Sequence, residues 1–351
     1  MLYLLNIFLI FILLMYLKTH HYKTEKAEQL IIILLILFAG LQLNFSDDYQ
    51  SYRGLFGEIN SIKDVINTIL EPGFAFLIFT FKKIGLGFNT FLLFIAFCSI
   101  NLKTKAIKKL SSLPYLSLLL YFLLYYITQD VIQIRQGLAI AVCFYAIIFI
   151  TEEKPHAFFG AVFIAITFHY SAIIFLPVYF LKNINLKNKK LILFLVFISL
   201  LISSVNILSI INWVNTSFLH SSYIFHKLKI YDTVSISIIS VTFFIRLLIY
   251  IFYIFFTDND NQNKLYANIY LLGIFIFSMF HSVEILAARF TIYFRFIEIL
   301  MIPDIYKSAK KCENKSKKIM IYTFLLFMLF YYILKFVLVL IDPNYLFYQS
   351  I

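Results

Sequence analysis

Residues 133–150 read QIRQGLAIAVCFYAIIFI, and from Gly137 to Ile150 this stretch holds no charged side chain. An apolar run of about 20 residues is what an α-helix needs to cross the hydrocarbon core of a bilayer. The chain therefore contains at least one predicted transmembrane helix. Similar apolar runs recur along the rest of the chain, at 1–17, 30–45, 87–102, 113–127, 157–168, 170–181, 191–211, 234–256, 265–281, 290–305 and 319–340.

The composition agrees with a membrane protein. Of the 351 residues, 62% are apolar and 14% charged, whereas soluble domains average roughly 45–50% and about 25%. A chain this apolar cannot cover its surface with polar groups, which rules out a soluble enzyme, and it is too apolar to be disordered. The sequence predicts an all-α polytopic integral membrane protein with about 12 transmembrane helices, organised as one multi-pass domain over residues 1–351.

The formal net charge of +12 comes from lysines that gather in short segments between the apolar runs. Basic residues favour cytoplasmic loops, so we expect these segments on the cytoplasmic side and both termini outside. The lysines do not alternate with aromatic residues on one face, so no nucleic-acid partner is predicted. The segments are 18–29, 103–112, 151–156, 182–190, 257–264 and 306–318.

The remaining segments are assigned to the outer face. They include two outer-face loops, at 46–86 and 212–233, and a short turn near 128–132. Residues 72–84 form an apolar run too short to span, which predicts a short interfacial or re-entrant helix. Residues 157–181 are expected to form a short membrane hairpin with His169 at its outer apex.

Arg135 is the first candidate site residue, because it begins a predicted helix at its outer end. A guanidinium offers a planar fork of donors to phosphate or carboxylate, and a helix N-terminus adds free N–H groups. Gln136 follows it as a further substrate ligand. The alternative is a structural role in which Arg135 neutralises Asp130 or lipid headgroups.

His169 is the second candidate. A neutral imidazole in a recess of the membrane could take a proton from a hydroxyl group. The alternative is a histidine that is simply hydrogen-bonded within a helix turn.

Two more arginines lie near the outer end of a late helix. Arg289 is a candidate anion ligand, and Arg295 lies about 120° round the helix from it. Arg295 could also form a structural pair with Glu298, three residues later. Arg246, in the middle of an apolar run, is expected to pair with an acid such as Glu298, and the alternative is a ligand to a charged substrate.

Acidic residues gather in the outer segment 46–86, with Asp47 and Asp48 adjacent and Glu71 before a Pro-Gly pair. Two contiguous carboxylates with no nearby histidine make a poor metal site, so no metal is predicted. Sugar hydroxyls or helix capping are the other interpretations of Asp47 and Asp48. Pro72 could simply open a helix after a turn.

Short motifs follow one another along the chain, namely Asp48-x3-Tyr52, Glu71-Pro72-Gly73-Phe74, Arg135-Gln136-x2-Ala139, Phe168-His169-x-Ser171-Ala172, and Arg289-x3-Tyr293-Phe294 followed by Pro303. In this order they resemble the Wzy-type polysaccharide polymerases, in particular the EpsG-like branch. The resemblance covers residues from about 40 to 310.

This resemblance implies a membrane glycosyltransferase of the bacterial cytoplasmic (inner) membrane, with its active site facing the periplasm or exterior. Donor and acceptor would be oligosaccharide repeat units on undecaprenyl pyrophosphate, joined by inverting transfer into O-antigen, capsule or exopolysaccharide. It implies no cofactor and no metal. A flippase and a chain-length regulator are expected as protein partners, beside the lipid bilayer.

The resemblance also gives the candidate residues roles. Arg135, with Arg289 and Arg295, would hold the pyrophosphate and stabilise its charge as it leaves. The base would be His169 or, failing it, one of the carboxylates. The remaining predicted substrate-binding residues comprise these carboxylates and three rings that could stack on sugars, namely Asp47, Asp48, Glu71, Tyr49, Tyr52 and Phe74.

Two other classes of protein stay open at this point. A transporter or flippase of lipid-linked glycans would also place arginines in a cavity, although inverted repeats are then expected. A membrane O-acyltransferase would also use a histidine within the membrane.

Overall fold

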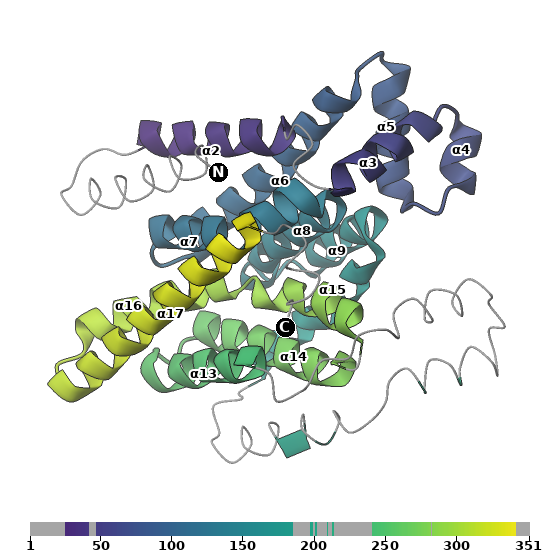
Figure 1. The fold of residues 1–351 in the computed structure, drawn as a ribbon. Helices are drawn as coiled ribbons and strands as arrows, with labels where there is room; N and C mark the ends of the chain where they lie inside the picture. The colour runs from purple at the N-terminus through teal and green to yellow at the C-terminus, as the bar shows by residue number, and fades with distance from the viewer. Residues whose placement is uncertain are drawn as a thin grey trace. The chain divides into compact units, whose positions relative to one another are not determined.

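The structure is a computed structural model, and it describes residues 25–41, 47–184, 241–281 and 283–341 together with isolated positions between 197 and 213. Over these residues every regular element is a helix (Figure 1). The described residues belong to two compact units. The first unit lies within Met1–Leu176 and Glu313–Pro343, and the second within Pro177–Cys312 and Asn344–Ile351.

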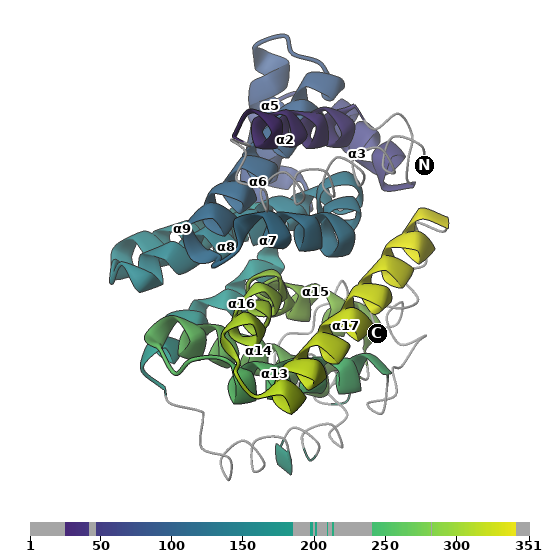
Figure 2. The same cartoon turned by 90° about the vertical axis from the view of Figure 1, so that its left-hand side faces the viewer.

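The first unit is built around helix α8, which packs against α6 and α9, while α2 packs on α6 (Figure 2). Prolines at the first helical positions begin α5, α7 and α9, where the missing N–H costs nothing. The bounds are α2 (Glu25–Gly40), α3 (Asp47–Glu58), α4 (Ile62–Asn67), α5 (Pro72–Lys83), α6 (Phe88–Leu110), α7 (Pro114–Tyr121), the π-helix η1 (Phe122–Ile132), α8 (Ile134–Thr151), α9 (Pro155–Phe168), the start of the 3₁₀-helix η2 (Tyr170–Asn183) and α17 (Lys315–Ile341).

Among its described residues the second unit has four α-helices, of which α14 contacts α13, α15 and α16. The amide of Asn268 donates to the carbonyl groups of Leu181 and Ile184 at 2.8 and 2.7 Å, which ties α14 to the end of η2. The guanidinium of Arg246 lies 4.1 Å from the ring centroid of Phe277 and is buried. The bounds are α13 (Val241–Phe256), α14 (Asn261–Phe280), α15 (Glu284–Arg295) and α16 (Glu298–Lys311).

Five helical stretches in the described part of the chain are long and apolar enough to cross a membrane. They confirm an all-helical membrane protein. The predicted run 1–17 and most of 191–211 and of the loop 212–233 lie outside the described residues, so the count of about twelve spans stays a prediction. The spans are Phe88–Leu110, Pro114–Ile132, Ile134–Thr151, Asn261–Phe280 and Lys315–Ile341.

Two sequence predictions in the first unit are wrong. Residues 103–112 were expected as a cytoplasmic loop, but α6 continues to Leu110 and Lys103 is fully buried. Residues 128–132 were expected as a short outer turn, but η1 runs through them without a break. Both errors have one cause: Lys103 and Asp130 neutralise each other inside the protein, at 2.7 Å.

Charged side chains join the segments that were predicted to share the cytoplasmic side. Lys108 lies 2.8 Å from Glu28, and Lys109 pairs with Glu152. Hydrogen bonds from Lys109 and Lys154 lower the pKa of Glu152 to about 2. In the second unit Lys311 and Asp258 make the corresponding pair at 3.6 Å, which links 306–318 to 257–264.

Candidate functional site

An ion pair joins the start of α5 to the start of α8. Nη1 of Arg135 lies 2.6 Å from Oε2 of Glu71, although the two residues are 64 positions apart. The Glu71 side chain is 8% exposed and that of Arg135 is 27% exposed, so the carboxylate is buried while the guanidinium is partly accessible to solvent. Asp130 pairs with Lys103, which makes the alternative of an Arg135–Asp130 pair wrong.

An aromatic ring covers the arginine. The centre of the Arg135 guanidinium lies 5.8 Å from the ring centroid of Tyr52, which α3 contributes. Burial raises the pKa of the Tyr52 hydroxyl, and the positive charge of Arg135 opposes this rise. The negative charge of Asp48 adds to it. Tyr52, predicted to bind substrate, therefore lies in the electric field of Arg135, and the charge of Asp48 acts on the same hydroxyl.

The other two predicted stacking rings belong to an apolar cluster that also contains Tyr52. Phe74 is fully buried, with its ring centroid 6.1 Å from that of Tyr52 and 5.4 Å from that of Phe91. Tyr49 is 8% exposed and contacts Phe88 edge to face. These rings hold α3 against α5 and α6, and their stacking on sugars stays a prediction. Asp47 begins α3, and its side chain lies outside the described part.

A second polar group follows one residue after Arg135. Nε2 of Gln136 lies 3.5 Å from Oγ of Ser171, and that oxygen lies 2.6 Å from Nδ1 of His169. Gln136 and Ser171 are buried, and His169 is half-buried at the end of α9. His169 is therefore hydrogen-bonded within a turn, as the alternative interpretation predicted. A chemical role for His169 remains compatible with these hydrogen bonds, because they also orient its ring.

Close packing of α5 on α9 places the two polar groups near each other. At Gly73 a Cβ atom would collide with the side chain and carbonyl of Thr167, two residues before His169. Glu71 and His169 therefore sit at neighbouring ends of two helices in contact. The sequence predicted Arg135, Glu71 and His169 separately, and the structure brings them into one end of the first unit. We call Tyr52, Glu71, Arg135, Gln136, His169 and Ser171 the Arg135 cluster.

Replacing Gly73 with alanine should therefore disturb this cluster without removing any of its functional groups. We expect a destabilisation of about 1–3 kcal/mol, because the added methyl group forces α5 away from α9. Gly160→Ala is the matched control, since it lies on α9 with nothing within 4 Å of its added Cβ. Equal thermal unfolding midpoints for the two purified variants would contradict the close approach.

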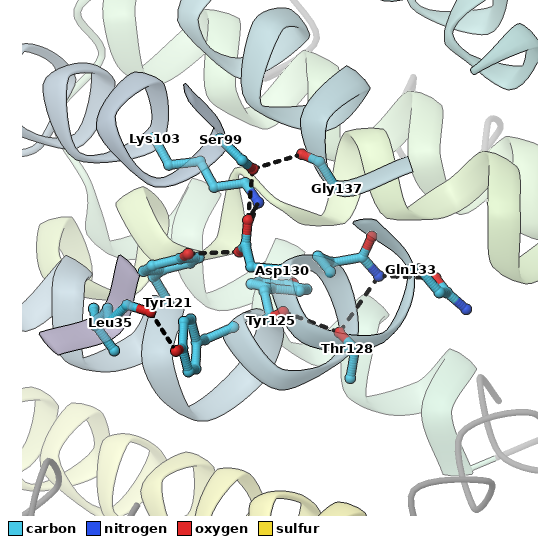
Figure 3. Close-up of polar contacts among 11 residues, drawn as sticks. Leu35, Ser99, Lys103, Tyr121, Tyr125, Thr128, Asp130, Gln133 and Gly137 are labelled. Atoms are coloured by element: carbon cyan, nitrogen blue, oxygen red, sulfur yellow. Dashed lines mark hydrogen bonds and ion pairs between the residues drawn. The ribbon is translucent and has the colours of Figure 1, made fainter. Parts of the chain in front are cut away.

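A buried polar network that the sequence did not predict joins α6, η1 and α8 (Figure 3). The carboxylate of Asp130 accepts hydrogen bonds from Lys103, at 2.7 and 2.8 Å, and from Ser99 and Tyr121, both at 2.5 Å. Ser99 also donates to the carbonyl of Gly137 at 3.2 Å. The network thus ties α6 and η1 to the first turn of α8, which carries Arg135.

A signal for this network was present in the sequence. Asp130 is an acid near the end of an apolar run, where an unpaired charge is costly. Ser99 and Lys103 are four apart and so share one face of α6. Because Lys103 was assigned to a loop, its ion pair with Asp130 was not predicted.

The predicted arginines of the second unit are half-buried. Arg289 lies within α15 and Arg295 ends that helix. Tyr293, four residues after Arg289, is buried. Because these residues belong to the other unit, their meeting with Arg135 stays a prediction. In the described residues no group of three or more His, Cys, Asp or Glu side chains could hold a metal ion.

These features define a multi-pass, all-helical membrane protein with a sheltered cationic cluster at one helix start. The chain belongs to the EpsG family, a family of Wzy-like polysaccharide polymerases, because the family model matches residues 28–350. A polysaccharide-polymerase function follows in general terms. No curated protein and no solved structure matches the chain. The resemblance inferred from the short motifs is confirmed, and the match extends beyond 40–310 at both ends.

Proposed function

We propose that the protein joins undecaprenyl-pyrophosphate-linked oligosaccharide repeat units into a surface polysaccharide, such as O-antigen, capsule or exopolysaccharide. The reaction would take place at the outer face of the bacterial cytoplasmic membrane, in a chain with about twelve spans. One observation carries the proposal: a partly exposed guanidinium at a helix start, held by a buried carboxylate and facing an aromatic ring, while the next residue of that helix, Gln136, is linked through Ser171 to a histidine.

The leaving group of this reaction is an anion, so a cation beside it would lower the energy of the transition state. A hydroxyl oxygen of the acceptor attacks the anomeric carbon of the donor and inverts it, while the bond from that carbon to the pyrophosphate oxygen breaks. Negative charge then grows on the pyrophosphate, and a preorganised guanidinium stabilises it. Arg135 would supply this group, with Arg289 and Arg295 as further anion ligands. The acceptor proton passes to a base of the site, from the set His169, Asp47, Asp48 and Glu71.

The direction of α8 supports an outer-face site. Arg135 lies at the start of this 18-residue helix and Glu152 follows its end, so the two are about 25 Å apart along the axis. Glu152 binds Lys109 and Lys154, in segments where the lysines favour the cytoplasmic side. The Arg135 cluster then lies at the opposite, outer end.

Deletion of the gene in the source organism tests the proposal. We expect the surface glycan to change from a ladder of chain lengths to a single repeat unit, and plasmid-borne wild type to restore the ladder. Gel analysis of the surface glycan measures both. Loss of all surface glycan, single units included, would favour a transporter, and a ladder of normal length lacking acyl esters would favour an O-acyltransferase. Either outcome would overturn the proposal.

A further inference from the structure

The hydrogen bonds around His169 determine which ring nitrogen carries the proton. Nδ1 lies 3.4 Å from the backbone nitrogen of Ser171 and 2.6 Å from its hydroxyl oxygen. A backbone N–H group can only donate, so Nδ1 accepts this bond with its lone pair. In the neutral imidazole the single proton then resides on Nε2.

The side chain of Gln136 fits this placement of the proton. Its Nε2 atom can only donate, and it lies 3.5 Å from Oγ of Ser171, which therefore accepts. Because Nδ1 of His169 carries no proton, Oγ donates its own proton to Nδ1, 2.6 Å away. Donors and acceptors then run in one direction, from α8 through Ser171 to the imidazole.

We propose that Ser171 is a positioning residue that holds His169 as an Nε2–H donor to the donor pyrophosphate, so that His169 is not the base. This inference rests on the proposed function. A base needs its lone pair on the nitrogen that meets the substrate, and here the lone pair points at Ser171. An N–H group complements a phosphate oxygen, which is the charge that Arg135, next to Gln136 in the chain, would also bind.

The proton of the acceptor hydroxyl then goes to a carboxylate. Glu71 is buried and bonded to Arg135 at 2.6 Å. When Glu71 takes the proton it becomes neutral, and the guanidinium of Arg135 keeps its full charge for the departing pyrophosphate. Bond formation, bond cleavage and proton transfer balance without any other reactant.

Replacing His169 with glutamine or asparagine tests whether the histidine acts as a hydrogen-bond donor or as a base. The amide nitrogen of glutamine reaches about as far as Nε2 of histidine, and that of asparagine about as far as Nδ1. We expect His169→Gln to keep the amount of polymer within about tenfold of wild type, and His169→Asn and His169→Ala to lose about 100-fold. A general base contributes about 10²–10⁴-fold, so under that role glutamine would fail as badly as alanine.

Ser171→Ala tests the positioning role. We expect about a fivefold loss of polymer, the worth of one hydrogen bond, in the wild-type background and none in the His169→Gln background. Ser51→Ala, on an exposed position of α3, is the control. An equal loss in both backgrounds would mean that Ser171 acts through packing and would overturn its positioning role.

Nitrogen NMR of purified protein labelled with ¹⁵N-histidine gives a readout independent of activity. The His169 signals are assigned by their loss in His169→Gln. Nδ1 should be unprotonated in wild type, and Ser171→Ala should shift part of the population to the other tautomer. A proton on Nδ1 in wild type would overturn the inference. A deletion strain that wild type does not restore to a polymer ladder would instead overturn the proposed function.

Discussion

Lys103→Met should lower the free energy of unfolding by about 3–5 kcal/mol, because it leaves the carboxylate of Asp130 buried without its counter-charge. The Lys103 and Asp130 side chains are both fully buried, with the nitrogen 2.7 Å from the nearer oxygen. Ser99 and Tyr121 still donate hydrogen bonds, but neither carries a charge. The thermal unfolding midpoint of the protein in detergent should fall by about 10 °C.

Two further variants make this result specific. Lys105→Met removes an exposed lysine two residues along the same helix and should leave the midpoint unchanged. The double variant Lys103→Met with Asp130→Asn should recover part of the loss, because it no longer buries an unpaired charge. If the double variant loses as much as the two single variants together, the pair contributes no coupling and the account is wrong.

The sequence predicted the helical membrane architecture because the length of an apolar run is a local property. The short run at 72–84 is the twelve-residue helix α5, and the apolar arms at 157–168 and 170–181 lie in the helices α9 and η2. The membrane hairpin that they were expected to form stays a prediction. The end of α6 was missed because the lysine rule assumes that a charge near the end of a run faces water. Lys103 breaks the rule since Asp130, 27 residues away, supplies a partner.

The candidate site was predicted residue by residue but not as an arrangement. Arg135, Glu71 and His169 each stood out as a polar group beside apolar sequence. Their pairing depends on α5 packing against α9, which Gly73 permits and which no local pattern reports. Ser171 appeared in a motif with no role attached, because its function depends on which ring nitrogen of His169 it contacts.

Arg135→Ala should reduce the amount of polymer by about 100-fold or more, the loss found when a group that stabilises transition-state charge is removed. The deletion strain carrying this variant should display single repeat units, as the empty deletion strain does. Arg135→Lys should restore little, because an ammonium lacks the planar fork that binds two phosphate oxygens at once. Arg53→Ala removes an exposed arginine of α3 and should leave the ladder intact.

The ion pair with Glu71 raises a second explanation, since Arg135→Ala also leaves a buried carboxylate unpaired. Exchanging the two residues, as Arg135→Glu with Glu71→Arg, separates the explanations. The exchange keeps a pair of opposite charges between α5 and α8 but moves the cation from the start of α8 to the start of α5. If Arg135→Ala loses polymer only because the fold is destabilised, the amount of Arg135→Ala protein in the membrane should fall together with the polymer. We expect the exchanged protein, which keeps the charge pair, to reach wild-type amounts in the membrane, measured by immunoblot, and to make no polymer, because the cation and the carboxylate base have both left their places.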